Sequence, residues 1–218
     1  MFFIIRNKNS SAGEISPEVA PIYNYVKDCI EQTANYGLYV VGAKGGYYFP
    51  SKNSLDTGEA YYVLNKENLI PDKKIIESQL AAYIEINLMD CINGFEKFPT
   101  FNVSEGEISA QTSLENNKLL VNVNYPITIQ RAGVMSEISE FKNIEIPTRA
   151  DLLYNIASNY SNLFMETGGI SLTYSSNVED SFNVIATSQH FPDYTIVTLT
   201  DGESLDNNLT YRWRFALA

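Results

Sequence analysis

The two cysteines have the clearest chemistry available to any residues of this sequence. Cys29 and Cys91 are the only cysteines, and each lies at or beside the apolar face of a segment with helical spacing. One alternative is a pair of buried free thiols, which are common core residues. The other is a disulfide joining the two helices, which an even count favours in an exported domain. Closing a loop of about 60 residues would stabilise the fold by roughly 3–4 kcal/mol.

Adjacent aromatic residues are the second candidates, and their chemistry is recognition. Tyr47, Tyr48 and Phe49 follow a run of glycines, and Tyr61 and Tyr62 lie in a short apolar segment. Tyrosine and phenylalanine are enriched at protein interfaces and on carbohydrate-binding platforms alike. Neighbouring residues on a strand point to opposite faces, so one ring of such a pair should be exposed. We therefore predict an aromatic interaction surface.

Familiar catalytic and metal-binding patterns are missing from the sequence. His190 is the only histidine, which excludes a multi-histidine zinc site, and we interpret it as an ordinary loop residue. Gly42, Gly45 and Gly46 lack the Gly-Lys-Ser/Thr ending of a phosphate-binding loop and are interpreted as a helix terminator. Segment 201–208 is rich in oxygen ligands but departs from the EF-hand pattern, so a polar hairpin loop is favoured over a calcium site. We predict no catalytic residue, metal ion or cofactor.

Four asparagines fit the N-glycosylation pattern Asn-x-Ser/Thr, which is compatible with export. A chain this rich in asparagine, serine and threonine also produces such segments by chance. The four candidate acceptors are Asn9, Asn102, Asn159 and Asn208.

The N-terminal segment differs from the rest of the chain. Residues 1–5 are apolar and the following residues through Gly13 are polar. Five residues are too few to cross a bilayer, which needs about 20, so either a short strand or the outer end of a transmembrane helix fits them. We interpret residues 1–13 as a membrane-proximal stub or linker. Residues 14–218 are then one extracytoplasmic α+β domain, with an alternative subdivision near residue 100.

Composition excludes several classes of protein. A hydrophobic content of 44% is enough for a core, so the chain is not a disordered one. The 26 acidic and 15 basic residues give a formal net charge of −11. A surface of this charge repels nucleic acids and anionic headgroups, so we predict no nucleic-acid partner and no membrane contact except through an N-terminal anchor.

Three segments have the spacing of amphipathic helices. The first, 17–42, follows the capping residue Ser16 and Pro17, and the second starts near Asp72. The third, 148–167, begins with a capping pattern at Thr148.

Strand-like alternation appears between and after these helices. Asn116 and Asn117 form a turn signal between segments 106–114 and 118–131, and Pro126 restricts the second to a sheet edge or a bulge. We predict an α+β fold with two N-terminal amphipathic helices, antiparallel sheets, the third helix and a C-terminal β-meander. The remaining expected strands are 60–64, 134–146, 170–175, 181–188, 194–200 and 209–217.

A set of short motifs resembles uncharacterised archaeal proteins from small-genome lineages. These proteins look like single-pass membrane-anchored proteins with an extracytoplasmic domain, so the resemblance implies an N-terminal anchor and paired cysteines outside the cytoplasm. This chain departs from them in lacking a full anchor. The motifs are Tyr25-Val26-x-x-Cys29-Ile30, Gly42-x-x-Gly45-Gly46-Tyr47-Tyr48, Ile76-Glu77-x-Gln79-Leu80-x-x-Tyr83-Ile84, Leu88-x-x-Cys91, Tyr125-Pro126 and Tyr211-Arg212-x-x-Phe215-Ala216.

We therefore expect a non-enzymatic component of the cell surface or envelope that acts through protein–protein contacts. Its partners would be other envelope proteins or further copies of itself. The alternative is an extracytoplasmic glycan- or peptide-binding module that uses the exposed aromatic residues. A second alternative is a carboxylate-based hydrolase, because 26 acids leave spatial pairing open.

Overall fold

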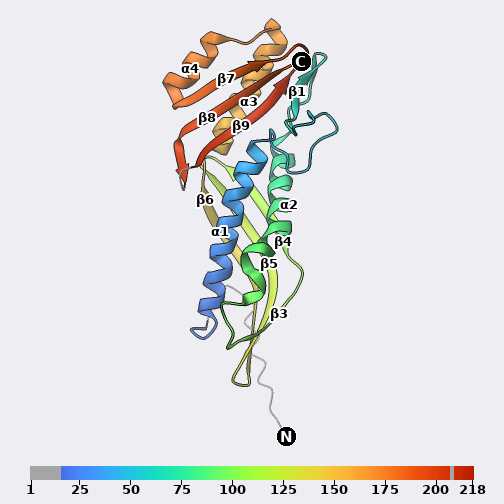
Figure 1. Ribbon diagram of the computed structural model, residues 1–218. Coiled ribbons are helices and arrows are strands. Elements are labelled where there is room, and N and C mark those ends of the chain that lie inside the picture. The colour runs from blue at the N-terminus through green and yellow to red at the C-terminus, as the bar shows by residue number, and fades with distance from the viewer. Residues whose placement is uncertain (1–15, 207–208) are drawn as a thin grey trace.

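Helices and runs of mainly antiparallel strands follow one another in separate groups along the chain, which confirms the predicted α+β fold. The computed structural model describes residues 16–206 and 209–218. Figure 1 shows an elongated molecule in which two layered halves stack end to end. The helices are α1 (Ala20–Gly42), α2 (Lys73–Ile92), the short 3-10 helix η1 (Asn93–Phe95), α3 (Ala150–Thr167) and α4 (Leu172–Phe182). The strands are β1 (Tyr61–Leu64), β2 (Glu67–Asn68), β3 (Asn102–Glu105), β4 (Ser109–Glu115), β5 (Lys118–Arg131), β6 (Val134–Pro147), β7 (Val184–His190), β8 (Thr195–Asp206) and β9 (Leu209–Leu217).

The lower half is a four-stranded antiparallel sheet covered by α1 and α2 (Figure 1). Its central strand β5 pairs with β6 along one edge and with β4 and β3 along the other. Along β5, buried residues alternate with exposed or half-buried ones, because one face meets the helices and the other meets solvent. The helices that cover this sheet come from before residue 100, and the sheet itself comes from after it.

Pro126 lies at an irregularity in the centre of β5. The pairing of β5 with β6 changes register between Asn124 and Ile127. On the opposite edge, β4 pairs up to Asn124 and β3 pairs from Ile127 onward. A proline cannot donate to the ladder, so both neighbouring strands interrupt their pairing at this point. Of the two predicted placements, the bulge is correct and the sheet edge is wrong.

The upper half is a five-stranded sheet in the order β2–β1–β9–β8–β7. Its pairs are antiparallel except for β1 with β9, which are parallel. The side chains of Trp213 and Phe215 on β9 are buried against Tyr154 and Tyr160 of α3. Helix α4 lies along β7 at the edge of this sheet (Figure 1).

Helix α4 replaces the strand that the sequence predicted at 170–175. The Ser171 hydroxyl accepts a hydrogen bond from the Tyr174 backbone N–H (3.2 Å), which makes Ser171 the N-cap of a helix. Only Val178 of this helix is buried, so its sequence lacks the apolar stripe that would have indicated a helix. The strand prediction at this position is therefore wrong.

Two predicted helix starts also differ from the structure. Helix α1 begins at Ala20 instead of residue 17, after a turn in which the Val19 and Ala20 N–H groups both donate to Ser16 O. Pro21, which needs no hydrogen-bond acceptor for its nitrogen, occupies the first turn. At α3 the Thr148 hydroxyl accepts from Ala150 N (3.2 Å), but the N-cap is Arg149, without a side-chain cap.

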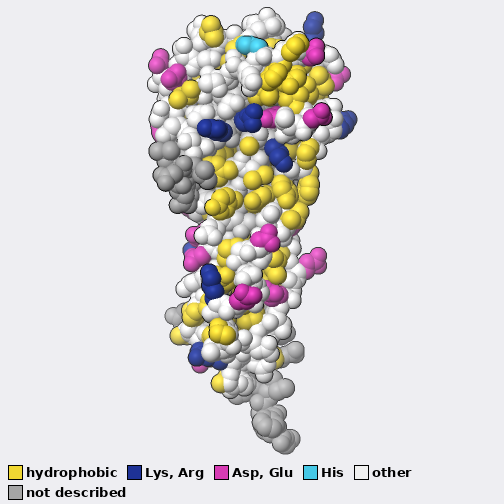
Figure 2. Space-filling view, viewed as in Figure 1, with side chains coloured by type: hydrophobic (Ala, Val, Ile, Leu, Met, Phe, Trp, Pro, Cys, Tyr) yellow, Lys and Arg dark blue, Asp and Glu magenta, His cyan; other side chains and the backbone are white. Residues whose placement is uncertain are grey.

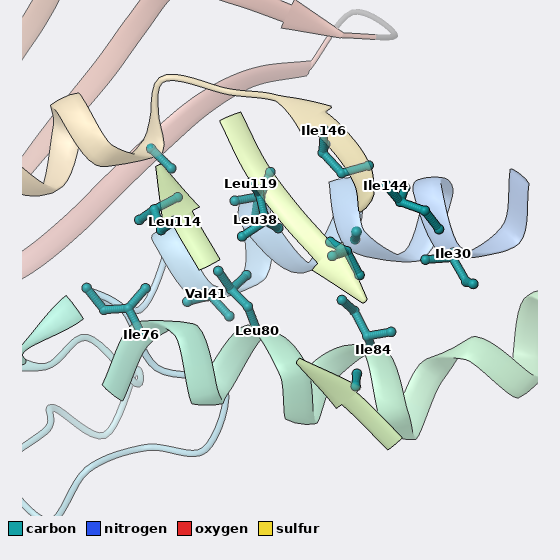
Figure 3. Packing of buried hydrophobic residues seen from close by; sticks show 14 of the residues in the cluster. Ile30, Leu38, Val41, Ile76, Leu80, Ile84, Leu114, Leu119, Ile144 and Ile146 are labelled. Carbon is teal, nitrogen blue, oxygen red and sulfur yellow. The ribbon is translucent and has the colours of Figure 1, made fainter. Parts of the chain in front are cut away.

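The buried side chains of both halves form one continuous cluster. Figure 3 shows its centre, where α1 and α2 meet the inner face of the lower sheet. Burying each such aliphatic side chain contributes about 1.5–3 kcal/mol, so this layer is a major source of stability. The labelled residues are Ile30, Leu38, Val41, Ile76, Leu80, Ile84, Leu114, Leu119, Ile144 and Ile146.

The connection between β6 and α3 joins the two halves. Thr148 N–H donates to Asn117 O in the β4–β5 turn (3.1 Å). The next residue, Arg149, donates from Nη1 to Asp201 Oδ1 of β8 (2.8 Å) and from Nη2 to the backbone oxygen of Phe182. Asp201 is fully buried, so its charge is compensated by Arg149 within the protein.

Candidate functional site

Cys29 of α1 and Cys91 of α2 lie at disulfide-bonding distance. Their Sγ atoms are 2.13 Å apart and their Cα atoms 5.6 Å apart. Cys29 is buried, whereas Cys91 is half-buried and borders an open groove between the two helices. Of the two alternatives left open by the sequence, the structure has the cross-linked pair.

A close contact between α1 and α2 sets the geometry above this cross-link. Gly37 of α1 faces Tyr83 of α2, and a Cβ atom at position 37 would lie 2.8 Å from Tyr83 Cδ1. No side chain larger than hydrogen fits there without moving the ring. The glycine therefore lets the Tyr83 ring lie against the backbone of α1.

The groove has a cavity volume of about 290 Å³. This is at the lower end of the range for ligand sites, so the groove fits one side chain or one sugar ring. Its walls combine two aromatic rings with amide and carboxylate groups. The lining residues are Gln32, Thr33, Tyr36, Tyr83, Asn87, Asp90 and Cys91.

Two of the predicted aromatic residues extend this groove. Tyr48 packs edge-on against Tyr83, with ring centroids 5.0 Å apart, and its own ring lies 4.7 Å from that of Phe49. The side chain of Gln79 on α2 fixes this loop, because its Oε1 accepts from the backbone N–H groups of Tyr48 (3.0 Å) and Phe49 (2.9 Å). Phe49 remains 52% exposed, so its ring is available for contact.

The polar groups of the groove include amides, hydroxyls and one carboxylate. Asn87 Nδ2 donates to Tyr83 O (2.7 Å) and to Tyr48 Oη (3.4 Å), which leaves its Oδ1 as an acceptor. Asp90 supplies a carboxylate in the last turn of α2, where no basic residue is present. Burial raises the pKa of the Tyr83 hydroxyl, and the nearby Asp90 charge adds to the rise.

The other predicted aromatic residues lie elsewhere. Tyr62 is fully buried in the upper core and stacks on Phe215, with ring centroids 4.7 Å apart. Tyr61 is half-buried and lies beside Tyr194 (6.4 Å) at a different surface. Tyr47 is half-buried, and burial followed by the Asp72 charge raises its pKa. The predicted set is therefore divided between the groove, the core and a second surface.

An exposed apolar ridge on α2 lies beside the groove. We use the name α2 ridge for Ile75, Ile86 and Met89, all of which are exposed. Together with Tyr36 and Phe49 they make up five of the ten large hydrophobic residues exposed in the described chain. In Figure 2, hydrophobic side chains gather over the middle of the molecule, where α1 and α2 reach the upper half, and in a second patch near the upper end. A concentration of this kind is typical of interaction surfaces.

A second hollow, of about 500 Å³, lies between α2 and β4 and contains two carboxylates. Glu85 Oε1 accepts from Ala110 N (2.7 Å), and Glu77 Oε1 accepts from Leu114 N (2.8 Å). These carboxylates satisfy N–H groups on the outer edge of β4, which protects that edge from pairing with another chain. Their contacts explain both acids as structural groups.

The remaining predicted sites are distributed over the surface. Asn102 on β3 and Asn159 on α3 are both exposed. Asn9, Asn208 and the apolar segment 1–5 lie outside the described residues. No helix within residues 16–206 and 209–218 is long and apolar enough to cross a membrane.

His190 and residues 201–206 both lie in strands, whereas the sequence predicted loops at these positions. His190 is exposed at the end of β7, with its Nδ1 3.0 Å from Thr195 Oγ1. Residues 201–206 continue β8 instead of forming the predicted hairpin loop. Among the described residues, no three His, Cys, Asp or Glu side chains cluster as metal ligands would.

Sequence reasoning missed Tyr36, Tyr83 and Asp90 as site residues. Tyr83 appears only within one of the resemblance motifs, and Tyr36 and Asp90 were not selected. The available signal was Gly37, because a glycine inside a long helix often marks a close packing contact. Comparison with protein families, curated proteins and solved structures finds no match for this chain. The functional proposal therefore rests on the fold and the groove.

Proposed function

We propose that this protein is a non-enzymatic recognition component of the cell surface or envelope, and that it binds a partner protein through the groove and the α2 ridge. The observation that carries the proposal is the concentration of exposed apolar side chains around a groove whose walls are cross-linked. Tyr36 and Ile86 are 55% and 53% exposed on neighbouring helices. Contact between these apolar side chains and water is unfavourable, so a complex in which a partner covers them is stabilised.

Rigidity supports the same function. The Cys29–Cys91 cross-link and the Gly37–Tyr83 contact fix the separation of α1 and α2. A surface that is already in its binding conformation loses less entropy when the partner binds. The groove is therefore better suited to recognition than an open pair of helices would be.

The proposed location is outside the cytoplasm, with the chain tethered by an N-terminal transmembrane helix. A disulfide-bonded pair is typical of an oxidising compartment, and the family resemblance implies an anchor. Protease added to intact cells should digest the protein. Resistance to the protease before lysis, with digestion after lysis, would contradict this location.

Cross-linking in isolated envelopes tests the partner contact. The variant Tyr36→Ser/Phe49→Ser/Ile86→Ser should lose the cross-linked complex that the wild type forms, because it removes the apolar surface around the groove. The control Leu172→Ser/Phe182→Ser/Ile185→Ser changes three other exposed apolar residues, all in the upper half, and should keep the complex. Retention of the complex by the groove variant, or loss in both variants, would reject this surface as the contact.

A glycan ligand is the second candidate, and the groove composition favours it. An exposed tyrosine beside the side chains of Gln32, Asn87 and Asp90 combines a stacking platform with hydrogen-bonding groups. A glycan array probed with the wild type and with Tyr36→Ala separates the two candidates. Binding that depends on Tyr36, without a cross-linked protein partner, would favour the glycan.

A further inference from the structure

The groove carries one formal charge, and it is negative. Asp90 is the only charged residue among those that line it. Lys44, which precedes the aromatic residues 47–49, is not a lining residue and donates to the backbone oxygen of Tyr48 (3.5 Å). Among the described residues that line the groove, a ligand therefore meets one carboxylate and no lysine or arginine.

The end of α2 adds partial negative charge at the same place. Helix α2 has 20 residues and no basic residue in its last turn. Its C-terminal carbonyl groups are equivalent to roughly half a negative charge, which favours a cation within the last turn. Tyr25 Oη donates to two of these carbonyl groups, those of Cys91 (3.0 Å) and Ile92 (3.1 Å), and Lys97 Nζ lies 4.8 Å from the centroid of the Tyr25 ring. Asp90 lies in this turn, and its carboxylate gives the groove its formal charge.

The aromatic walls suit a cation as well as an apolar group. The face of a tyrosine ring attracts an ammonium or guanidinium group within about 6 Å of its centroid. Tyr83 also lines the groove, and its ring is held by Gly37 on one side and by Tyr48 on another, so its position is fixed before a ligand binds. Tyr36 lines the groove and remains largely exposed.

From these observations we propose that the groove binds the cationic side chain of an arginine or lysine from a basic segment of the partner protein. This inference rests on the proposed function and specifies the chemistry of the partner. The cavity of about 290 Å³ accepts one such side chain. The guanidinium or ammonium group packs on the tyrosine rings that line the groove, and the Asp90 carboxylate and Asn87 Oδ1 accept its hydrogen bonds. The formal net charge of −11 attracts a basic segment over a longer range.

Titration with capped amino acids, followed by the amide NMR signals of the groove, tests this inference. The probes are N-acetyl-arginine amide, N-acetyl-lysine amide and N-acetyl-citrulline amide, the last being a neutral analogue of arginine. We expect the two cationic probes to shift the signals of the lining residues. Citrulline should bind about tenfold more weakly, because it loses both the cation–π and the charge contribution. Added salt should weaken the binding of the cations.

Protein variants identify the groups that act on the probe. Asp90→Asn and Tyr36→Ala should each weaken arginine binding by roughly two- to fivefold, the range for exposed ion pairs and cation–π contacts. The control Asp180→Asn removes an equal charge from the exposed face of α4 and should leave arginine binding unchanged.

The outcomes separate this inference from the proposed function. Equal binding of citrulline and arginine in a Tyr36-dependent manner would overturn the charge selectivity and leave the groove as a binding surface. Equal losses in Asp90→Asn and Asp180→Asn would attribute the attraction to overall charge and overturn the site. Absence of any shift in the groove would also overturn the inference, whereas the partner contact would still be decided by cross-linking.

Discussion

The groove and the junction between the two halves hold packed elements together in different ways. At the groove, α1 and α2 are joined covalently through Cys29 and Cys91, and the surrounding surface is open to solvent. At the junction, Arg149 joins the β6–α3 connection to the fully buried Asp201 of β8. The first connection depends on the redox conditions, and the second depends on keeping two opposite charges together inside the protein.

Because the two connections differ, the two regions differ in how well they tolerate substitutions. A disulfide stabilises the fold by reducing the conformational entropy of the unfolded chain. Residues on the surrounding folded surface can therefore be substituted without weakening it. A buried ion pair makes each partner necessary, because removal of one leaves an uncompensated charge in the interior. The open groove is therefore suited to carry function, and the junction is suited to fix the arrangement of the halves.

The largest effect is expected from breaking the junction. Arg149→Met should lower the free energy of unfolding by about 3–5 kcal/mol, because it leaves Asp201 buried without a cation. The midpoint and slope of urea unfolding measure this change. The double variant Arg149→Met/Asp201→Leu replaces both charged residues by apolar ones and should recover part of the lost free energy.

Glu203 supplies the matched control for this prediction. Its carboxylate also contacts Arg149, at 2.9 Å, but its side chain is 57% exposed. Glu203→Gln should therefore change the free energy of unfolding by less than about 1 kcal/mol. If Arg149→Met costs no more than Glu203→Gln, the buried pair does not hold the halves together.

A smaller loss of stability is expected when the cross-link at the groove is opened. Cys29→Ala/Cys91→Ser should lower the free energy of unfolding by about 2–4 kcal/mol through the larger entropy of the unfolded chain. The sequence separation closed by the bond is 62 residues. Urea unfolding of the wild type with and without a reductant should show the same difference. Equal midpoints in both conditions, or no mass change of the intact protein on reduction, would contradict the cross-link.

The elements that the sequence predicted well are those with strong periodic patterns. Ile76, Leu80, Ile84 and Leu88 repeat at helical spacing, and all four are buried in α2. Alternation along β5 predicted a half-buried strand for the same reason. Helix α4 was missed because only Val178 of its residues is buried, so local capping at Ser171 decides its structure without leaving an apolar pattern.

The candidate site was predictable only in part. Tyr48 and Phe49 stood out as an aromatic pair, but their place beside Tyr83 depends on how α1 packs on α2. Tyr62 looked like an equivalent residue and lies in the core, because position along a strand decides which of two adjacent rings faces inward. Arg149 and Asp201 lie far apart in the sequence, and no local pattern indicates that they meet.

Two buried tyrosines near the end of α1, Tyr62 and Tyr211, should give the smallest changes in the free energy of unfolding. Trp213 Nε1 donates to Tyr62 Oη (2.9 Å), and that hydroxyl donates to Gly45 O (3.2 Å). The hydroxyl of Tyr211, which is also buried, has no hydrogen-bond partner among the described residues. Tyr62→Phe should cost about 1–3 kcal/mol because it leaves a buried N–H and a carbonyl unpaired, whereas Tyr211→Phe should be neutral or slightly stabilising.

The pH dependence of stability provides the internal control for these two variants. Burial raises the pKa of both Tyr62 and Tyr211 above the usual value. The unfolded chain therefore releases these protons at lower pH than the folded protein, and the stability they contribute is lost as pH rises above about 10. Each Tyr→Phe variant should show a smaller loss in this alkaline range, measured by urea unfolding, although only Tyr62→Phe is less stable at neutral pH. If Tyr211→Phe lowers the free energy of unfolding as much as Tyr62→Phe does, the Tyr211 hydroxyl has a hydrogen-bond partner and is not an unsatisfied polar group.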